Sequence, residues 1–98
     1  MWSNKELAAE VEAILSDQSA RNWSIVLYND DINTFDWVID CLVKYCGHDL
    51  VQAEQCAYFV HTKGKYAVKF GDKIKLKPIC ETLQEKGLSA SLEKISNE

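Results

Sequence analysis

The sequence has no long apolar run and no excess of basic residues. Its 98 residues contain 11 Lys and Arg against 15 Asp and Glu, a formal net charge of −4. A nucleic-acid binder needs a basic surface to neutralise phosphates, so this composition argues against that class. The only apolar stretch near the N-terminus is interrupted by Glu6, Glu10 and Glu12. We therefore expect neither a signal peptide nor a membrane span, and we predict a cytoplasmic protein that does not act on membranes.

The sequence also lacks any C-x-x-C pair, and the spacing of its four cysteines matches no zinc signature. Three of them stand among apolar residues at positions that suit packed helix faces. We expect reduced core thiols, with no disulfide, metal or cofactor. A chain of this length supports one small domain with a single core. The cysteines are Cys41, Cys46, Cys56 and Cys80.

Local patterns predict an N-terminal helix followed by the order β-α-α-β-α-β. Ser3 and Glu6 form a capping box, so we assign residues 1–22 to a helix and loop and residues 23–98 to the main domain. The predicted fold is α+β, a two-layer sandwich with helices on one face of a three-stranded antiparallel sheet. The expected strands are 24–29, 65–70 and 88–92, and the expected helices are 35–46, about 50–63, and a last one with Pro78 in its first turn, running to about 86.

A cluster of small polar residues, Asn29 to Thr34, directly follows the apolar run 23–27. Turn and capping chemistry is the ordinary explanation for such a cluster. In an extended chain Asn29 and Asp31 share one face, whereas Asp30 points elsewhere. His61 lies at the border of an apolar helical stripe, where it either makes a structural hydrogen bond or faces a groove.

With Phe35-Asp36-Trp37-Val38-Ile39-Asp40-Cys41-Leu42, Val60-His61 and Lys63-Gly64-Lys65, this cluster resembles the ClpS family, adaptors of Clp proteases. The resemblance spans roughly residues 23–94. It implies an adaptor, not an enzyme, that binds N-degron substrates beginning with Phe, Leu, Trp or Tyr. It also implies delivery of these substrates to a Clp-type AAA+ unfoldase through the N-terminal domain of that unfoldase.

The resemblance implies three sets of site residues. An α-ammonium offers three donors, and an Asn carbonyl, an Asp carboxylate and a neutral His can each accept one. The α-amino set is Asn29, Asp30, Asp31 and His61; the hydrophobic pocket is Asn33, Phe35, Val38, Ala57, Val60 and Leu88; the unfoldase contacts are Asp72 and Lys77.

Some positions depart from the family pattern. The family commonly has Met where this chain has Phe35, and often a second Met where it has Ala57, so we expect a wider pocket that admits branched first residues. The family usually begins with a flexible extension where a helix is expected here. The segment 71–83 is also shorter than the corresponding segment usual in the family. The alternating segment 73–77 is either a basic stripe for an acidic partner or an exposed edge.

Two other classes stay open. A protein-interaction domain resembling the C-terminal domain of ribosomal protein L7/L12 would have a related architecture without amine capture. A Cys-His hydrolase would pair Cys56 with His61. These residues are five apart, about 140° around one helix, which does not suit a nucleophile and its base.

Overall fold

The computed structural model describes residues 22–95, in which three strands and three helices follow the predicted order. Each predicted strand boundary lies within two residues of the observed one. The predicted N-terminal helix falls outside the described residues. The elements are β1 (Trp23–Tyr28), α2 (Phe35–Cys46), α3 (Leu50–Lys63), β2 (Lys65–Gly71), α4 (Lys73–Glu85) and β3 (Ala90–Lys94).

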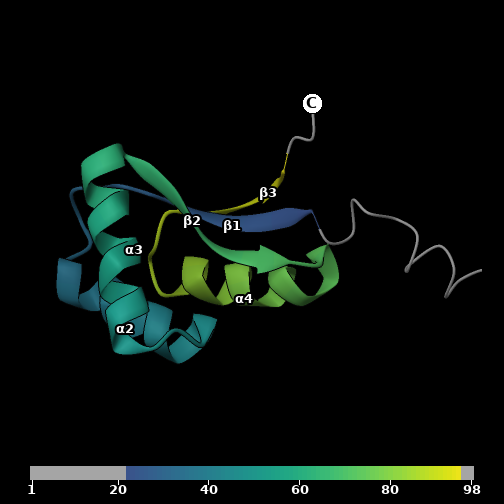
Figure 1. Ribbon diagram of the computed structural model, residues 1–98, viewed down its shortest axis with the longest axis horizontal. Coiled ribbons are helices and arrows are strands. Elements are labelled where there is room, and N and C mark those ends of the chain that lie inside the picture. Colours follow the sequence, from purple (N-terminus) through teal and green to yellow (C-terminus); the bar gives the residue numbers. More distant parts are fainter. Residues whose placement is uncertain (1–21, 96–98) are drawn as a thin grey trace, which may run out of the picture.

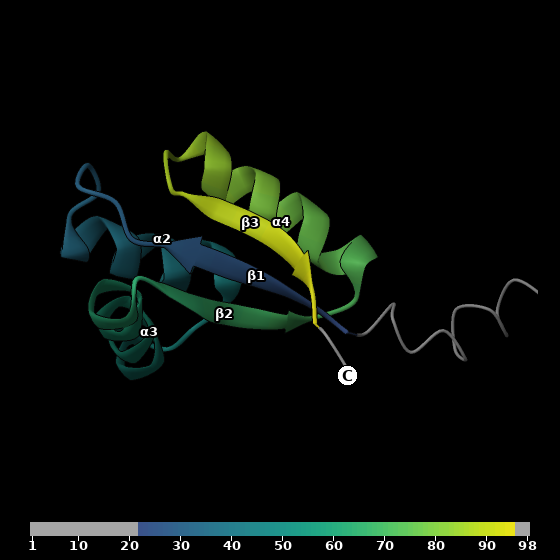
Figure 2. The ribbon, with the colours of Figure 1, turned by 90° about the horizontal axis from the view of Figure 1, so that it is seen from above.

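The three strands form one antiparallel sheet with β1 in the centre, in the order β2-β1-β3 (Figure 2). At one end of the sheet Trp23 pairs with Gly71, and at the other Tyr28 pairs with Lys65. The register shifts once, because Ile25 opposes Lys69 while Val26 opposes Ala67. The extra residue on β2 makes this a bulge, which bends that edge strand.

All three helices pack on one face of the sheet (Figure 1), which confirms the predicted two-layer α+β sandwich. Ile25 and Leu27 alternate onto this face of β1 and join one continuous core with Leu42 of α2 and Leu83 of α4. Burial of such side chains contributes roughly 1.5 to 3 kcal/mol each relative to exposure. The sheet and helices therefore stabilise each other across one shared apolar layer.

The ends of α2 and α3 follow from local capping chemistry. Thr34 begins α2, where its hydroxyl accepts a hydrogen bond from the Trp37 N–H at 3.1 Å, and Gly47 ends it at φ 74°. Asp49 begins α3, where its carboxylate accepts from the Gln52 N–H at 2.7 Å, as predicted. Gly64 ends α3 at φ 87°, and the loop that follows Tyr28 meets this C-terminal end.

The prediction for the last helix is wrong at its start. We expected Pro78 in the first turn, but α4 begins at Lys73 and carries Pro78 in its interior. Residues 73–77 are therefore helical and do not form an exposed edge. A proline inside a helix removes one backbone hydrogen bond. Burial of Leu76 and Leu83 on the core side of α4 offsets that loss.

All four cysteines are free and buried, as expected. Burial raises the pKa of the Cys46 thiol to about 11, and it also raises the pKa of Cys56. Thiols with raised pKa values carry little reactive thiolate at neutral pH.

No helix within residues 22–95 is long and apolar enough to span a bilayer.

Replacing Pro78 tests how much this proline lowers the free energy of unfolding. The Pro78→Ala variant restores a backbone N–H to the interior of α4, so we expect the free energy of unfolding to rise by about 1 kcal/mol or more. Urea denaturation of both proteins followed by circular dichroism measures the difference. A less stable variant would contradict the regular helical hydrogen bonding of α4 around this position.

Candidate functional site

Nine of the ten predicted substrate-binding residues line a single cavity of about 220 Å³. They come from three separate stretches of chain: the loop after β1, the start of α2 and the last two turns of α3. Polar and apolar side chains both contribute to the wall. The lining residues are Asn29, Asp30, Asp31, Asn33, Phe35, Val38, Ala57, Val60 and His61.

Backbone hydrogen bonds bring these stretches together. The N–H of Asn29 donates to the carbonyl of Gly64, at the end of α3, over 2.8 Å, and the N–H of Tyr28 donates to the carbonyl of Ser89 over 2.9 Å. The loop after β1 is thus held between the end of α3 and the start of β3. The rings of Phe35 and His61 meet edge to face, with centroids 6.2 Å apart.

The carboxylate of Asp30 holds the loop in shape. One oxygen accepts from the backbone N–H groups of Ile32 and Asn33, at 3.0 and 2.8 Å. The other accepts from the Asn33 side-chain amide and the Ser89 hydroxyl, both at 2.9 Å. Because a carboxylate has about four acceptor sites, these bonds occupy its full capacity. Asp30 therefore borders the cavity while its oxygens are turned to the loop.

These hydrogen bonds lower the pKa of Asp30 from 3.8 to about 2. The backbone N–H of Asn33 has the largest effect, and the donors on the Asn33 side chain, Ser89 and Ile32 act in the same direction. Partial desolvation opposes them. Donors aimed at the ionised form favour the carboxylate over the acid. Asp30 is consequently charged throughout the physiological range.

The mouth of the cavity is polar and exposed, whereas its inner wall belongs to the core. Asp31 and His61 are exposed, and Phe35 is 43% exposed at the entrance. Ala57 and Val60 are buried, so α3 supplies a closed apolar wall. A ligand here would place a charged or polar end at the mouth and an apolar side chain inside.

Leu88 is the one predicted pocket residue that does not line this cavity. It is buried and lines an adjoining space of about 30 Å³, together with Val38 and Val60. Both of these valines also line the main cavity. Leu88 therefore lies behind the apolar wall and supports it.

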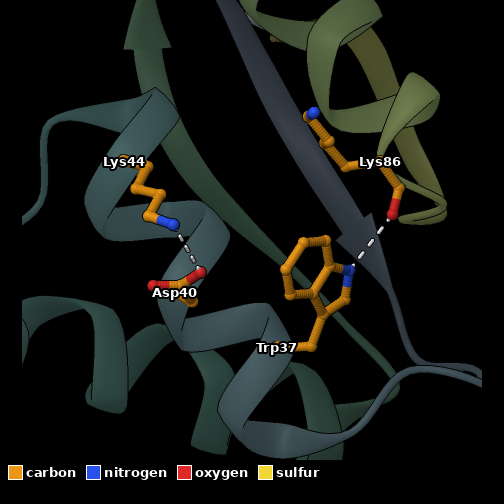
Figure 3. A network of polar contacts seen from close by, with 4 residues as sticks. All are labelled: Trp37, Asp40, Lys44 and Lys86. Carbon is orange, nitrogen blue, oxygen red and sulfur yellow. Dashed lines mark hydrogen bonds and ion pairs between the residues drawn. The ribbon is translucent and has the colours of Figure 1, made fainter.

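Sequence reasoning missed several residues that position the site. Ser89 bonds to Asp30, and the carbonyl of Gly87 accepts from the Asn33 side-chain amide at 2.9 Å. The indole N–H of Trp37 donates to the carbonyl of Lys86 at 3.1 Å (Figure 3). These partners lie 49 to 59 residues apart in the chain. No local pattern signals them, because each pairs a loop or helix start with a distant carbonyl or hydroxyl.

Figure 3 also shows how α2 is stabilised on its outer side. Asp40 and Lys44 point toward each other one turn apart and form an ion pair of 3.1 Å. Exposed pairs of this kind contribute only a few tenths of a kcal/mol. The orientation of α2 against the site therefore depends mainly on the Trp37 hydrogen bond and on core packing.

A larger hollow of about 480 Å³ lies between α3 and β2. Its wall includes Cys56 and the buried His48, whose Nε2 bonds to the carbonyl of Val68 at 2.8 Å. Burial lowers the pKa of His48. Cys56 borders this hollow and His61 borders the other cavity, so the two lie on different sides of α3. The structure gives no support to a Cys-His pair.

Metal binding finds no support in the described part of the chain. No group of three or more His, Cys, Asp or Glu side chains within residues 22–95 is arranged to hold a metal ion.

The predicted unfoldase contacts lie away from the cavity. Asp72 precedes the first residue of α4, and Lys77 is exposed on that helix.

Comparison with known families agrees with this fold. The family model described as ATP-dependent Clp protease adaptor protein ClpS matches residues 18–91. That match covers most of the chain and places the protein in the class of adaptors of the ATP-dependent Clp protease. The chain belongs to the ClpS family.

Individual relatives carry the same description. An ATP-dependent Clp protease adapter protein ClpS from Corynebacterium aurimucosum is 27% identical over 88 residues, covering 90% of this chain and 79% of the relative. The ClpS of Serratia proteamaculans is 34% identical over 64 residues, covering 65% of this chain and 60% of the relative. The structure of Agrobacterium tumefaciens ClpS2 bound to L-phenylalaninamide has a similar fold, with a TM-score of 0.62 and 19% identity, over 74% of this chain and 94% of that one.

The role of Asp30 leads to a pH-dependent prediction. Because the pKa of Asp30 is lower in the folded protein than its ordinary value of 3.8, its contribution to stability is present above that value and is lost as the pH falls toward 2. At neutral pH we expect Asp30→Ala to lower the free energy of unfolding by about 1 to 2 kcal/mol. The gap between variant and parent should narrow below about pH 4.

Urea denaturation at several pH values measures that gap. Asp31→Ala is the matched control, since it removes a neighbouring exposed carboxylate that is not part of the Asp30 network. A gap for Asp30→Ala that stayed constant as the pH fell would contradict the assigned role of the carboxylate.

Proposed function

We propose that this adaptor binds the free α-amino group and the bulky hydrophobic first side chain of N-degron substrates, and that it delivers them to a Clp-type AAA+ unfoldase. The observation that carries the proposal is the composition of the 220 Å³ cavity. Acceptor side chains stand at its mouth and apolar side chains form its inner wall. A protein N-terminus combines an amine, which the acceptors at the mouth could bind, with a first side chain, which the apolar wall could bury.

The mouth of the cavity suits a cation. Its lining contains two carboxylates, two side-chain amides and one imidazole, and no Lys or Arg. The α-ammonium of a protein is mostly charged at neutral pH and offers three donors. Because the oxygens of Asp30 are already bonded within the loop, we assign the three acceptors to Asn29, Asp31 and His61. The negative charge of Asp30 adds a favourable field.

This arrangement would distinguish chain ends from internal peptides. An internal peptide brings an amide N–H in place of an ammonium, so Asp31 would lose water without gaining a charged partner. Leaving such a group unpaired costs roughly 1 to 3 kcal/mol. Capture of an N-terminal amine is an established mode of peptide recognition.

The size of the cavity fits one side chain. Its volume of about 220 Å³ lies below the ~300 to 1,000 Å³ typical of sites for drug-sized ligands. The structural relative from Agrobacterium tumefaciens binds L-phenylalaninamide, a molecule that combines a free amine with a phenylalanine side chain. That ligand supports Phe as a first residue for this chain, and we propose Leu, Trp and Tyr with it because their side chains are also bulky and largely apolar.

Delivery to the unfoldase would use a different surface. Asp72 directly precedes α4 and Lys77 lies in the first half of that helix, which follows β2. The last residue of β2, Gly71, pairs with Trp23, and Trp23 is at the opposite end of β1 from the cavity. Separate surfaces would let the N-terminal domain of an unfoldase bind while a substrate occupies the cavity. The alternative, an interaction domain without amine capture, would not need an acceptor cluster at the cavity mouth.

Blocking the amine tests the proposal. We expect a Phe-initiated peptide to bind and its N-acetylated form not to bind, as measured by fluorescence anisotropy. Asp31→Ala should weaken binding of the free peptide by about tenfold or more, because a charge-assisted bond worth about 1.4 kcal/mol is lost.

Asp36→Ala provides the control for net charge, since Asp36 is an exposed carboxylate on α2 that does not line the cavity. The affinity of this variant for the free peptide should stay within about twofold of that of the parent, the range of an ordinary surface substitution. Equal binding of free and acetylated peptides would overturn amine capture and favour the plain interaction domain.

The small side chain of Ala57 predicts the shape preference. Ala57 is buried on the inner wall and leaves space where a longer side chain would exclude branched first residues. In Ala57→Met we expect Ile-initiated peptides to lose affinity by roughly 1 to 3 kcal/mol, while Leu- and Phe-initiated peptides lose less. Anisotropy with peptides that differ only in residue one measures the change.

Tyr58→Met is a suitable control, because it introduces the same side chain on the exposed side of α3. If Ile-initiated peptides bound the parent no better than they bound Ala57→Met, the space beside Ala57 would not reach the ligand. The wider-pocket interpretation would then be wrong.

A further inference from the structure

One buried histidine joins the connection between α2 and α3 to the edge strand β2. His48 is 6% exposed, and its Nε2 lies 2.8 Å from the carbonyl oxygen of Val68. Val68 is the extra residue of the β2 bulge, so no residue of β1 pairs with it. A buried carbonyl is normally bonded to a donor. His48 supplies this donor from outside the sheet.

The hydrogen bond to Val68 fixes where the imidazole carries its proton. A carbonyl oxygen only accepts, so Nε2 is the protonated nitrogen and Nδ1 carries a lone pair. Nδ1 is buried and has no hydrogen-bond partner within residues 22–95. The imidazole of His48 is therefore neutral in this arrangement. A second proton on the ring would create a buried N–H donor without an acceptor.

The charged groups near His48 are one ammonium and one carboxylate. Burial has the largest effect on the imidazole and lowers the pKa of His48 from its ordinary value of 6.5. The bond to the Val68 carbonyl and the neighbouring Asp49 act in the opposite direction. Lys69 adds to the effect of burial. Its ammonium is held in place on β2 because it donates to the carbonyl of Cys46 at 2.9 Å.

The hollow of about 480 Å³ beside His48 has no carboxylate in its wall. The other titratable side chains there are two thiols, one phenol and one ammonium: Cys46, Cys56, Tyr66 and Lys69. The carboxylate of Asp49 caps α3, where it accepts a hydrogen bond from the Gln52 N–H at 2.7 Å. A charged imidazole would consequently gain no direct acidic partner in the hollow.

We propose that protonation of His48 at mildly acidic pH opens the contact between residues 47–49 and the bulge of β2. The charged ring has to reach water, because its new Nδ1–H has no acceptor in the closed arrangement. The adjoining hollow gives the ring a path to solvent. This switch is independent of the proposed substrate function, since it lies before the start of α3 and the cavity residues lie in the last two turns.

The sign of the pH dependence follows from the two states of the chain. The unfolded chain protonates His48 near its ordinary pKa of 6.5, whereas the folded protein does so only at lower pH. The contribution of neutral His48 to stability is therefore present above pH 6.5 and is lost as the pH falls below it. One proton changes the unfolding equilibrium constant by at most about tenfold per pH unit. The contribution of Asp30 is lost only at lower pH, toward 2.

Urea denaturation between pH 7.5 and 5.5 tests the effect on stability. Over this interval the unfolding equilibrium constant of the parent should rise severalfold more than that of His48→Gln, and at most about tenfold more. The amide of the variant can donate to the Val68 carbonyl but takes up no proton. His61→Gln is the matched control, because His61 is the other histidine and is exposed. It should keep the pH dependence of the parent. Equal pH dependence of the parent and His48→Gln would overturn the proposal.

Two further measurements do not require the His48 variant. His61→Gln leaves His48 as the only histidine, so an NMR titration of the imidazole gives its pKa directly, and a midpoint at or above 6.5 would overturn the proposal. Hydrogen exchange of the parent, corrected for the intrinsic exchange rate at each pH, locates the opening. Residues 46–52 and 66–70 should lose protection severalfold at pH 5.5, while residues 73–85 of α4 keep theirs. Uniform loss of protection, or none, would contradict a local opening at His48.

Discussion

The whole site depends on the hydrogen bonds that converge on the Asp30 carboxylate. Four donors from Ile32, Asn33 and Ser89 meet its two oxygens within 3.0 Å. They fix the loop after β1 against the turn before β3, while the bond from Asn29 to Gly64 fixes it against α3. Charge-assisted bonds of this kind are stronger than neutral ones. The acceptors at the cavity mouth are therefore positioned before any ligand arrives.

Two neighbouring carboxylates at the cavity have different surroundings. Asp30 is saturated by donors of its own chain, whereas Asp31 is exposed at the mouth of the cavity. The inner wall is made of buried residues such as Ala57 and Val60, which also pack into or against the core. In a domain this small the pocket is formed by core residues, and its shape depends on the packing of α3.

The sequence predicted those features that depend on neighbouring residues. Asp49 and Gly64 signalled the ends of α3 because capping is local, and the period of the apolar residues signalled α2. Pro78 misled the prediction for α4, because core burial of Leu76 and Leu83 outweighs a rule of local backbone preference. The polar cluster around Asn29 was visible in the sequence, but its partners Gly87 and Ser89 were not, since they lie more than 50 residues away.

The most direct test of the account is an NMR titration of the isotope-labelled protein with L-phenylalaninamide and with its N-acetylated form. The account predicts that the free amine shifts the backbone amide signals of residues 29–35 and 57–61, and that the acetylated form does not. Shifts centred on the hollow beside His48, or equal shifts with both compounds, would contradict it.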